Sequence, residues 1–351
     1  MIYRLRKLST RSLKSLAAPL WKPRRAGRRL APGRYRNAGK VAILCYHRIV
    51  TDIVQAEQGT AHGMVISAET FRRQMELVRE HYEVLSLADA VAVLRGERKA
   101  SGPALAITFD DGYRDFYELA WPTLRELGLT ATVFIPTAYI DAGQMLDHDR
   151  IYQYVMEAQS RRLSLRVPLI KAGIDEEKVT TVCAGVEPYR AAEILSHLPF
   201  TLRERVLQCL DDFFGGEQNG EPNEFSLLDW DQVREMAGAG VSFGAHTVNH
   251  VILTNEEPQT VESEILRSKQ VIEKEIGQTV RHFAYPTGRH NAAVRKVVAS
   301  AGFEAAVTTE RRFNRPSDDL MSLGRICLCE ESTRGITGRY SEAVARWRLA
   351  A

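Results

Sequence analysis

Three short segments carry side chains whose types and spacing could do chemistry together. One holds two neighbouring carboxylates, the second holds two imidazoles four residues apart, and the third shapes a turn with Pro and Gly. Adjacent buried carboxylates repel each other and need a cation or a shared proton. One Asp and two His form a frequent ligand set for a catalytic metal ion. The residues concerned are Asp110, Asp111, His246, His250 and the segment 283–288.

Each segment also has an ordinary structural interpretation. An Asp-Asp pair often belongs to a turn or a helix cap. Two His four residues apart usually lie on an exposed helix, and they can face one cation if the backbone between them makes a helical turn. A functional site is favoured because all three segments lie where an apolar run that predicts a strand ends. In a parallel barrel the strands end on one face, where active sites lie.

The elements that must position these residues alternate between strand and helix. Short apolar runs predict buried strands, and most of the segments between them have helical periodicity. Such alternation implies right-handed crossovers and a parallel sheet. Seven or eight such units are enough to close a barrel. We therefore predict an α/β fold, a distorted (β/α) barrel of seven or eight units. The strands are expected at 41–46, 104–109, 130–135, 241–245, 280–285, 303–308 and 322–328.

Composition divides the 351 residues into unequal parts. The first 40 residues hold 13 Lys and Arg and no Asp or Glu, whereas the whole chain has a net charge of only +3, so the remainder is acidic. We predict a basic arm and linker over 1–40, a catalytic barrel over 41–330 and a C-terminal tail over 331–351. Residues 142–228 are too many for a plain loop and predict a helical insert.

The basic arm suits an anionic membrane surface, because Lys and Arg alternate there with apolar residues. A solvated tail or an organelle transit peptide would have the same composition. Nucleic acid is not an expected partner. No apolar run reaches the roughly 18 residues of a membrane span, and five scattered Cys favour a reducing compartment. We therefore expect a cytoplasmic protein, peripheral at the inner membrane face.

The three segments resemble the motifs of the polysaccharide deacetylases, carbohydrate esterase family four. Thr-Phe-Asp-Asp-Gly at 108–112 matches the first motif, and His-Thr-Val-Asn-His at 246–250 matches the second. Phe-Ala-Tyr-Pro-Thr-Gly at 283–288 is similar to the third, in the form seen in poly-N-acetylglucosamine deacetylases. The resemblance covers roughly 41–330, apart from much of 142–228. It implies a deacetylase-type barrel that removes N-acetyl groups from N-acetylhexosamine units of a polysaccharide or glycan precursor, such as a cell envelope glycan.

The resemblance also implies roles for individual residues. Asp110 would be the general base, while Asp111, His246 and His250 would hold a divalent metal, usually zinc. The metal would act as a Lewis acid and lower the pKa of the attacking water. The backbone N–H of Thr287 would complete an oxyanion hole. The same segment would supply the substrate-binding residues Tyr285 and Pro286.

The chain departs from the family pattern at two places. Most members have Arg in the third motif where Ala284 stands, and Arg325 is either its replacement or part of a structural ion pair. The Leu-x-His motif that usually supplies the general acid is missing, since 322–329 contains no His. His47 closes the first predicted strand and is our candidate for the acid, the alternative being a structural His bonded to the backbone.

Two other functions stay open at this stage. The chain could be another amide hydrolase on the same scaffold, acting on cyclic amides or imides, or a non-catalytic glycan-binding protein. The complete metal-ligand set argues against the second. We interpret His148 and His62 as ordinary surface residues and Trp230 as a packing residue. Bound metal and acetate release would discriminate among these functions.

Overall fold

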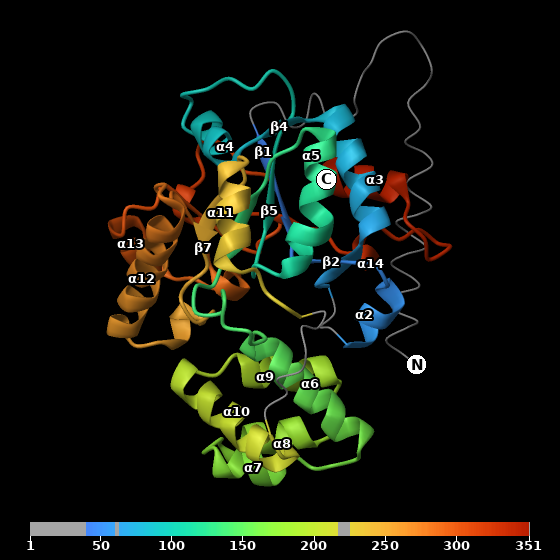
Figure 1. Cartoon of the computed structure of the whole chain (residues 1–351), viewed down its shortest axis with the longest axis vertical. Coiled ribbons are helices and arrows are strands. Elements are labelled where there is room, and N and C mark those ends of the chain that lie inside the picture. Colours follow the sequence, from blue (N-terminus) through green and yellow to red (C-terminus); the bar gives the residue numbers. More distant parts are fainter. Residues whose placement is uncertain (1–39, 60–62, 217–224, 351) are drawn as a thin grey trace.

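The computed structural model describes residues 40–59, 63–216 and 225–350 (Figure 1). The predicted basic arm, apart from Lys40, lies outside the described residues. Within them, no helix is both long and apolar enough to cross a membrane.

A curled parallel sheet forms the centre of the molecule. Its hydrogen-bonded order is β10-β1-β5-β6-β7-β8-β9, with β4 beside β5. Every predicted strand is present, although the later ones are shorter than expected. Their side chains are almost entirely buried, which explains why continuous apolar runs identified them. The strands are β1 (Val41–Tyr46), β4 (Glu83–Leu85), β5 (Ala104–Phe109), β6 (Thr132–Ile135), β7 (Ser242–Ala245), β8 (His282–Ala284), β9 (Ala305–Val307) and β10 (Ile326–Cys327).

Residues between β9 and β10 bring the two edges of the sheet together. Val307 forms a parallel bridge with Leu323, and β10, which follows, pairs with β1. The fully buried side chain of Asn314 accepts from the Gly324 N–H at 2.7 Å and donates to the Gly324 carbonyl at 2.8 Å. The sheet is therefore a distorted barrel whose strands end on one face, as predicted. A separate pair, β2 (Arg48–Val50) and β3 (Val65–Ser67), was not predicted.

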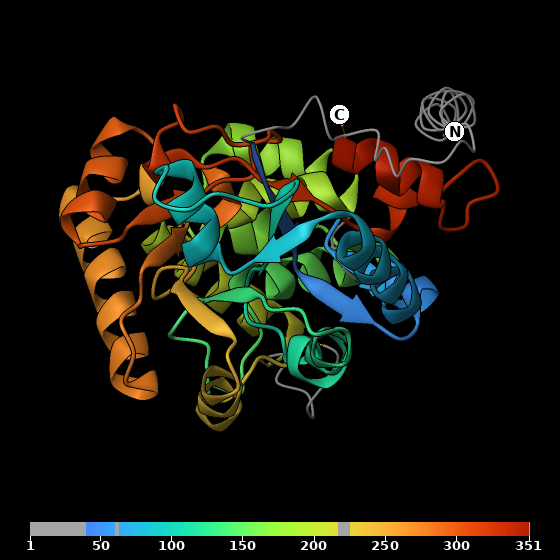
Figure 2. The ribbon, with the colours of Figure 1, turned by 90° about the horizontal axis from the view of Figure 1, so that it is seen from above.

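Amphipathic helices cover the outside of the sheet, as Figure 2 shows from above. In α3, for example, Phe71, Met75 and Val78 recur at helical spacing and are all buried. The Ser67 hydroxyl accepts from the Thr70 N–H and caps this helix. The covering helices are α3 (Ala68–His81), α4 (Leu87–Leu94), α5 (Trp121–Leu127), α11 (Trp230–Gly238), α12 (Pro258–Ile276) and α13 (Ala292–Ser300).

Between β6 and β7 the chain leaves the barrel and forms a helical lobe (Figure 1). The lobe has a hydrophobic cluster of its own, which includes Ile151, Leu169 and Val206. We call this lobe the helical insert. Its helices are α6 (Asp147–Ser160), α7 (Arg166–Lys171), α8 (Glu176–Cys183), α9 (Pro188–Ser196) and α10 (Phe200–Phe214).

The segment predicted as a C-terminal tail is instead part of the barrel domain. It contains α14 (Glu330–Thr333) and α15 (Glu342–Ala350), and Leu349 is buried in the core cluster. The Gln74 side-chain amide of α3 donates to the Thr333 hydroxyl at 3.1 Å, and the Tyr82 hydroxyl donates to the Leu349 carbonyl at 3.0 Å. The predicted boundary at residue 330 needs correction because this segment completes the packing around α3.

Candidate metal and hydrolytic site

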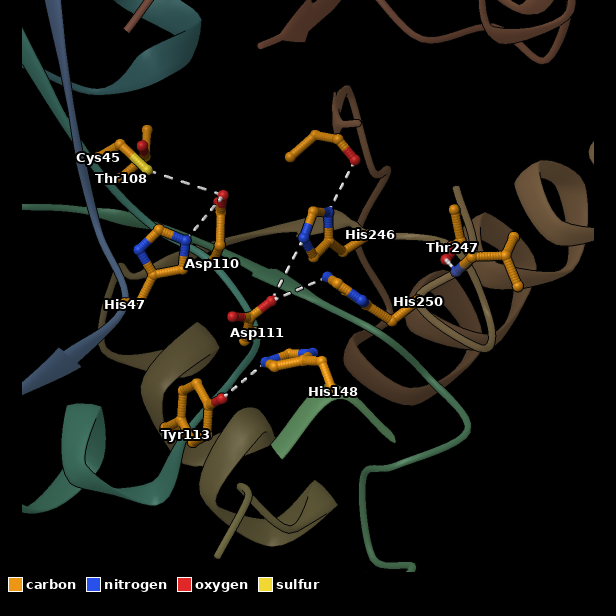
Figure 3. Close-up of polar contacts among 12 residues, drawn as sticks. Cys45, His47, Thr108, Asp110, Asp111, Tyr113, His148, His246, Thr247 and His250 are labelled. Carbon is orange, nitrogen blue, oxygen red and sulfur yellow. Dashed lines mark hydrogen bonds and ion pairs between the residues drawn. The ribbon is translucent and has the colours of Figure 1, made fainter. Parts of the chain in front are cut away.

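The carboxyl ends of β5 and β7, which flank β6, bring two Asp and two His together (Figure 3). His246 Nε2 lies 3.4 Å from Asp111 Oδ1, and His250 Nε2 lies 3.2 Å from the same oxygen. Asp110, one residue earlier, points away from the two imidazoles. The neighbouring carboxylates therefore have different partners, as their expected roles require.

Left-handed backbone, and not a helical turn, makes the side chains converge. Thr247 and His250 have φ values of 67° and 49°, so the two imidazoles converge without the helical turn that could also have brought them together. Asp111 has φ 75° and is followed by Gly112 with φ 72°. A Cβ on Gly112 would lie 2.9 Å from Ile135 Cγ2, so the sharp turn after β5 depends on glycine.

Hydrogen bonds from two sides hold this strained loop. The buried Glu264 carboxylate of α12 accepts from the N–H groups of Val248 (2.8 Å) and Asn249 (2.9 Å), and from the Asn249 side-chain amide (2.7 Å). Arg203 of the helical insert donates to the Asn249 carbonyl at 2.9 Å. A non-Gly residue in left-handed backbone costs about 1–3 kcal/mol, so such support is needed to keep His250 in place.

The donor set fits a divalent metal. Among the described residues, Asp111 Oδ1 is a buried oxygen with no hydrogen-bond partner, and it lies between two imidazole nitrogens. Three ligand atoms, one from each of Asp111, His246 and His250, lie within 4.8 Å of one another. His246 Nδ1 donates to the Ala284 carbonyl at 2.8 Å, which leaves Nε2 with a free lone pair. Burial lowers the pKa of His250 to about 4. In His246 burial is outweighed by the hydrogen bond and charge of Asp111, together with the charge of Asp110, which raise the pKa, so this ring must lose a proton when it binds a metal.

Asp110 is held by a buried guanidinium. Arg325 Nη1 and Nη2 donate to its two carboxylate oxygens at 2.7 and 2.6 Å, and Arg325 Nε donates to the Thr308 carbonyl at 2.8 Å. Of the two roles left open for Arg325, the geometry favours the one that replaces the missing motif Arg. Burial raises the pKa of Asp110, but Arg325 outweighs it and holds this pKa below the usual value. Asp110 is therefore ionised at neutral pH.

His47 follows β1 on the same face. Its Nε2 lies 4.0 Å from Asp110 Oδ2, and its side chain is 18% exposed. Cys45 Sγ donates to the same carboxylate oxygen at 3.7 Å. Burial lowers the pKa of His47 more than the two carboxylates raise it. His47 thus lies beside the base, and its role as the general acid stays a prediction.

The third segment, 283–288, contacts the site through the Ala284 carbonyl, which accepts from His246 Nδ1. Tyr285 is completely buried and its hydroxyl donates to the Met321 carbonyl at 2.9 Å, while Pro286 is also buried. The structure therefore corrects the expectation that these two residues bind substrate, because their packing removes them from the surface. Thr287 is exposed with φ 57°, and its carbonyl accepts from the Thr309 hydroxyl at 3.1 Å. Its N–H stays a prediction for the oxyanion hole.

The expectation that His148 is an ordinary surface residue is wrong. His148 is the second residue of α6, and its ring centroid lies 5.1 Å from that of His250. The contact between His148 and His250 could not be predicted from the sequence, because it depends on how the helical insert packs against the barrel. Trp230 packs against the core, as expected, and His62 lies outside the described residues.

Comparisons with known proteins agree with this geometry. The family model described as polysaccharide deacetylase matches residues 97–167 and 199–306, so the unmatched stretch between them lies within the helical insert. A curated protein of Bacillus subtilis (strain 168), named "Putative polysaccharide deacetylase YxkH", is 22% identical over 306 residues. That match covers 87% of this chain and 77% of the relative.

Solved structures show the same fold. The deacetylase PplD of Streptococcus pyogenes, solved with acetate, is 21% identical with a TM-score of 0.55, covering 85% of this chain and 96% of PplD. IcaB from Ammonifex degensii is 19% identical with a TM-score of 0.56, covering 89% and 98%. A de-N-acetylase from Aggregatibacter actinomycetemcomitans is 16% identical with a TM-score of 0.54, covering 83% and 95%.

Proposed function

The chain belongs to the polysaccharide deacetylase family, and from this premise we propose that it hydrolyses N-acetyl groups from N-acetylhexosamine units with the help of a divalent metal. One observation carries the proposal. An ionised Asp110, fixed by Arg325, stands directly beside the Asp111, His246 and His250 ligand set. A base and a Lewis acid side by side are what amide hydrolysis by water requires.

The ligand set would hold the ion through one carboxylate and two imidazoles, a combination that suits zinc. When bound, the ion supplies a Lewis acid that polarises the acetyl carbonyl and lowers the pKa of the attacking water. The Thr287 N–H would donate a hydrogen bond to the negative charge that develops on the carbonyl oxygen.

Asp110 takes the proton of the attacking water. A carboxylate has about four lone-pair positions, so it can bind Arg325 through both oxygens and still accept a proton. The guanidinium keeps this carboxylate ionised and fixes its direction, since both oxygens are held within 2.7 Å of Arg325 nitrogens. A base positioned in this way contributes roughly 10²–10⁴ to the rate.

His47 gives a proton to the departing nitrogen. Its pKa lies below the usual value, so its ring is neutral at pH 7 before the reaction starts. The proton that it delivers must then come from the attacking water through Asp110, and one water molecule would bridge the 4.0 Å between its Oδ2 and Nε2 of His47. The C–N bond breaks, and the products are acetate and a free amine.

The substrate would be a polysaccharide or a glycan precursor of the cell envelope. The 13 basic residues of segment 1–40 would keep the enzyme at the inner face of the membrane by binding anionic lipid. At that place a nucleotide-linked or lipid-linked sugar is as suitable a substrate as a polymer.

A substrate panel tests the proposal. The full chain, loaded with zinc, is mixed with N-acetylglucosamine oligomers of β-1,4 and β-1,6 linkage, a peptidoglycan fragment, a nucleotide-linked N-acetylglucosamine and a cyclic imide, and released acetate is measured. We expect acetate from at least one N-acetylated sugar and none after chelation. Ring opening of the imide without acetate from any sugar would point to a different amide hydrolase. Sugar binding without hydrolysis would point to a binding protein.

A further inference from the structure

The helical insert brings an imidazole to the edge of the metal-ligand set. His148 lies in the first turn of α6, and its ring faces that of His250 at a centroid distance of 5.1 Å (Figure 3). Its side chain is 21% exposed, so the ring borders both the site and solvent. The mechanism described above does not use it.

Two buried side chains fix the orientation of this ring. The Tyr113 hydroxyl donates to Asp149 Oδ2 at 2.6 Å, so its hydrogen is not available to His148. The same hydroxyl oxygen lies 3.3 Å from His148 Nε2 and therefore accepts from an Nε2–H. Nδ1 is then the ring nitrogen that does not face Tyr113. Among the described residues, none bonds to Nδ1.

The helical insert is also fastened to the loop that carries His250. Arg203 of α10 is 3% exposed, and its Nε donates to Asp147 Oδ2 at 2.8 Å. Its Nη2 donates to the Asn249 carbonyl at 2.9 Å. One guanidinium thus links the residue before His148 to the residue before His250, so the two rings keep a fixed separation.

We propose that His148 is a substrate-positioning residue that accepts, through Nδ1, a hydrogen bond from a sugar hydroxyl next to the reacting acetamido group. The inference rests on the proposed function and deepens it, because it assigns part of sugar recognition to the helical insert. The ring is preorganised by Tyr113 and Asp149, borders the ligand set and offers an unused acceptor. A sugar ring is rich in hydroxyl donors.

Three substitutions at one position test the role of Nδ1. Asn places its side-chain oxygen near the position of Nδ1, whereas Gln reaches only the position of Nε2. With zinc-loaded protein and penta-N-acetylchitopentaose as the probe, we expect His148→Ala to raise KM about fivefold to tenfold with little change in kcat, as one lost hydrogen bond would. His148→Asn should restore KM to within about threefold of the wild type, and His148→Gln should not. The matched control is His197→Ala in the same insert, which should leave KM unchanged.

Other outcomes separate this role from a structural one. Zinc content and melting temperature are measured for every variant. Two results for His148→Ala are informative here, namely a loss of zinc and a fall in kcat by the same factor by which KM rises. Either result would mean that the ring only supports His250, and would overturn the proposal. An unchanged KM, or equal rescue by Gln, would also overturn it.

Failure of the proposed function would look different. If the wild type releases no acetate from the pentamer, its affinity is measured by calorimetry with and without His148→Ala. Weaker binding by the variant would support the role of His148 although the reaction assignment had failed. Equal affinity, or no binding by either protein, would overturn it.

Discussion

Arg325 and Asp110 form a buried ion pair in which one side chain sets the chemistry of the other. Arg325 is fully buried, and its fork of donors matches both carboxylate oxygens. Removing one partner of such a pair leaves an uncompensated buried charge. Without the cation, burial alone acts on the Asp110 carboxylate and raises its pKa.

At this scale we predict that Arg325→Gln moves the acid limb of the pH profile of kcat/KM to higher pH. The base must be ionised to work. The wild-type pKa of Asp110 lies below its usual value, so the wild-type limb lies at low pH, and loss of the guanidinium shifts it upward. We also expect a rate at neutral pH that is lower by roughly 10²-fold. Arg95→Gln, which removes a surface pair with Glu304, is the control. An acid limb at the same pH in both variants would refute this role for Arg325.

A second prediction concerns His47. His47→Ala should keep its zinc and its fold but lose most of kcat on an N-acetylated sugar, because proton donation matters in the transition state. The loss should be much smaller for 4-nitrophenyl acetate, whose leaving group needs little protonation. Steady-state rates on both substrates check this. Near-normal turnover of the sugar amide by the variant would exclude His47 as the acid.

At the scale of elements, the loop after β7 depends on α12. Glu264 accepts three hydrogen bonds from residues 248 and 249, and these bonds hold the left-handed backbone that aims His250. We predict that Glu264→Gln weakens zinc binding about 10-fold to 100-fold, the usual effect of losing a group that orients a metal ligand. Glu262→Gln, at an exposed position of the same helix, is the control. Competition with a chromogenic chelator measures both affinities, and equal values would contradict the prediction.

The elements also show what sequence could and could not predict. Buried parallel strands are continuous apolar runs, so β1 and β5 could be predicted with their motifs in place. The strands β2, β3 and β4 were missed because each has only three residues. β8 and β9 are equally short, but they could be predicted as parts of the longer stretches 280–285 and 303–308.

Within the site, the ligand types and their strand ends were readable from the chain. The left-handed conformations of Thr247 and His250 were not, because they are imposed by contacts with Glu264 and Arg203, which are distant in sequence. The same reason explains why His148 was misjudged and why Tyr285 was expected at the surface.

At the scale of the whole molecule, charge is distributed unevenly along the chain. Segment 1–40 carries 13 Lys and Arg, and the rest of the sequence is acidic. We predict that deleting residues 1–40 abolishes binding to vesicles that contain phosphatidylserine but barely changes turnover of a soluble substrate. Binding by the full chain should weaken with salt, since attraction is screened within ~10 Å at 0.1 M. A full-length variant in which Arg24, Arg25, Arg28 and Arg29 are changed to Gln keeps the length of the segment but lowers its positive charge. It therefore shows whether charge or mere presence of the segment causes binding. Equal vesicle binding by all three proteins in a sedimentation assay would reject the tether.

We propose that Asp111, His246 and His250 hold one catalytic metal ion, and a metal titration examines this proposal. The full chain is stripped with a chelator, zinc is added back in steps, and acetate release from the best N-acetylated substrate is followed beside bound zinc. We predict no activity without metal and recovery that is complete at one zinc per chain, with His250→Ala recovering neither binding nor activity. Full acetate release from the stripped protein would exclude a catalytic metal ion.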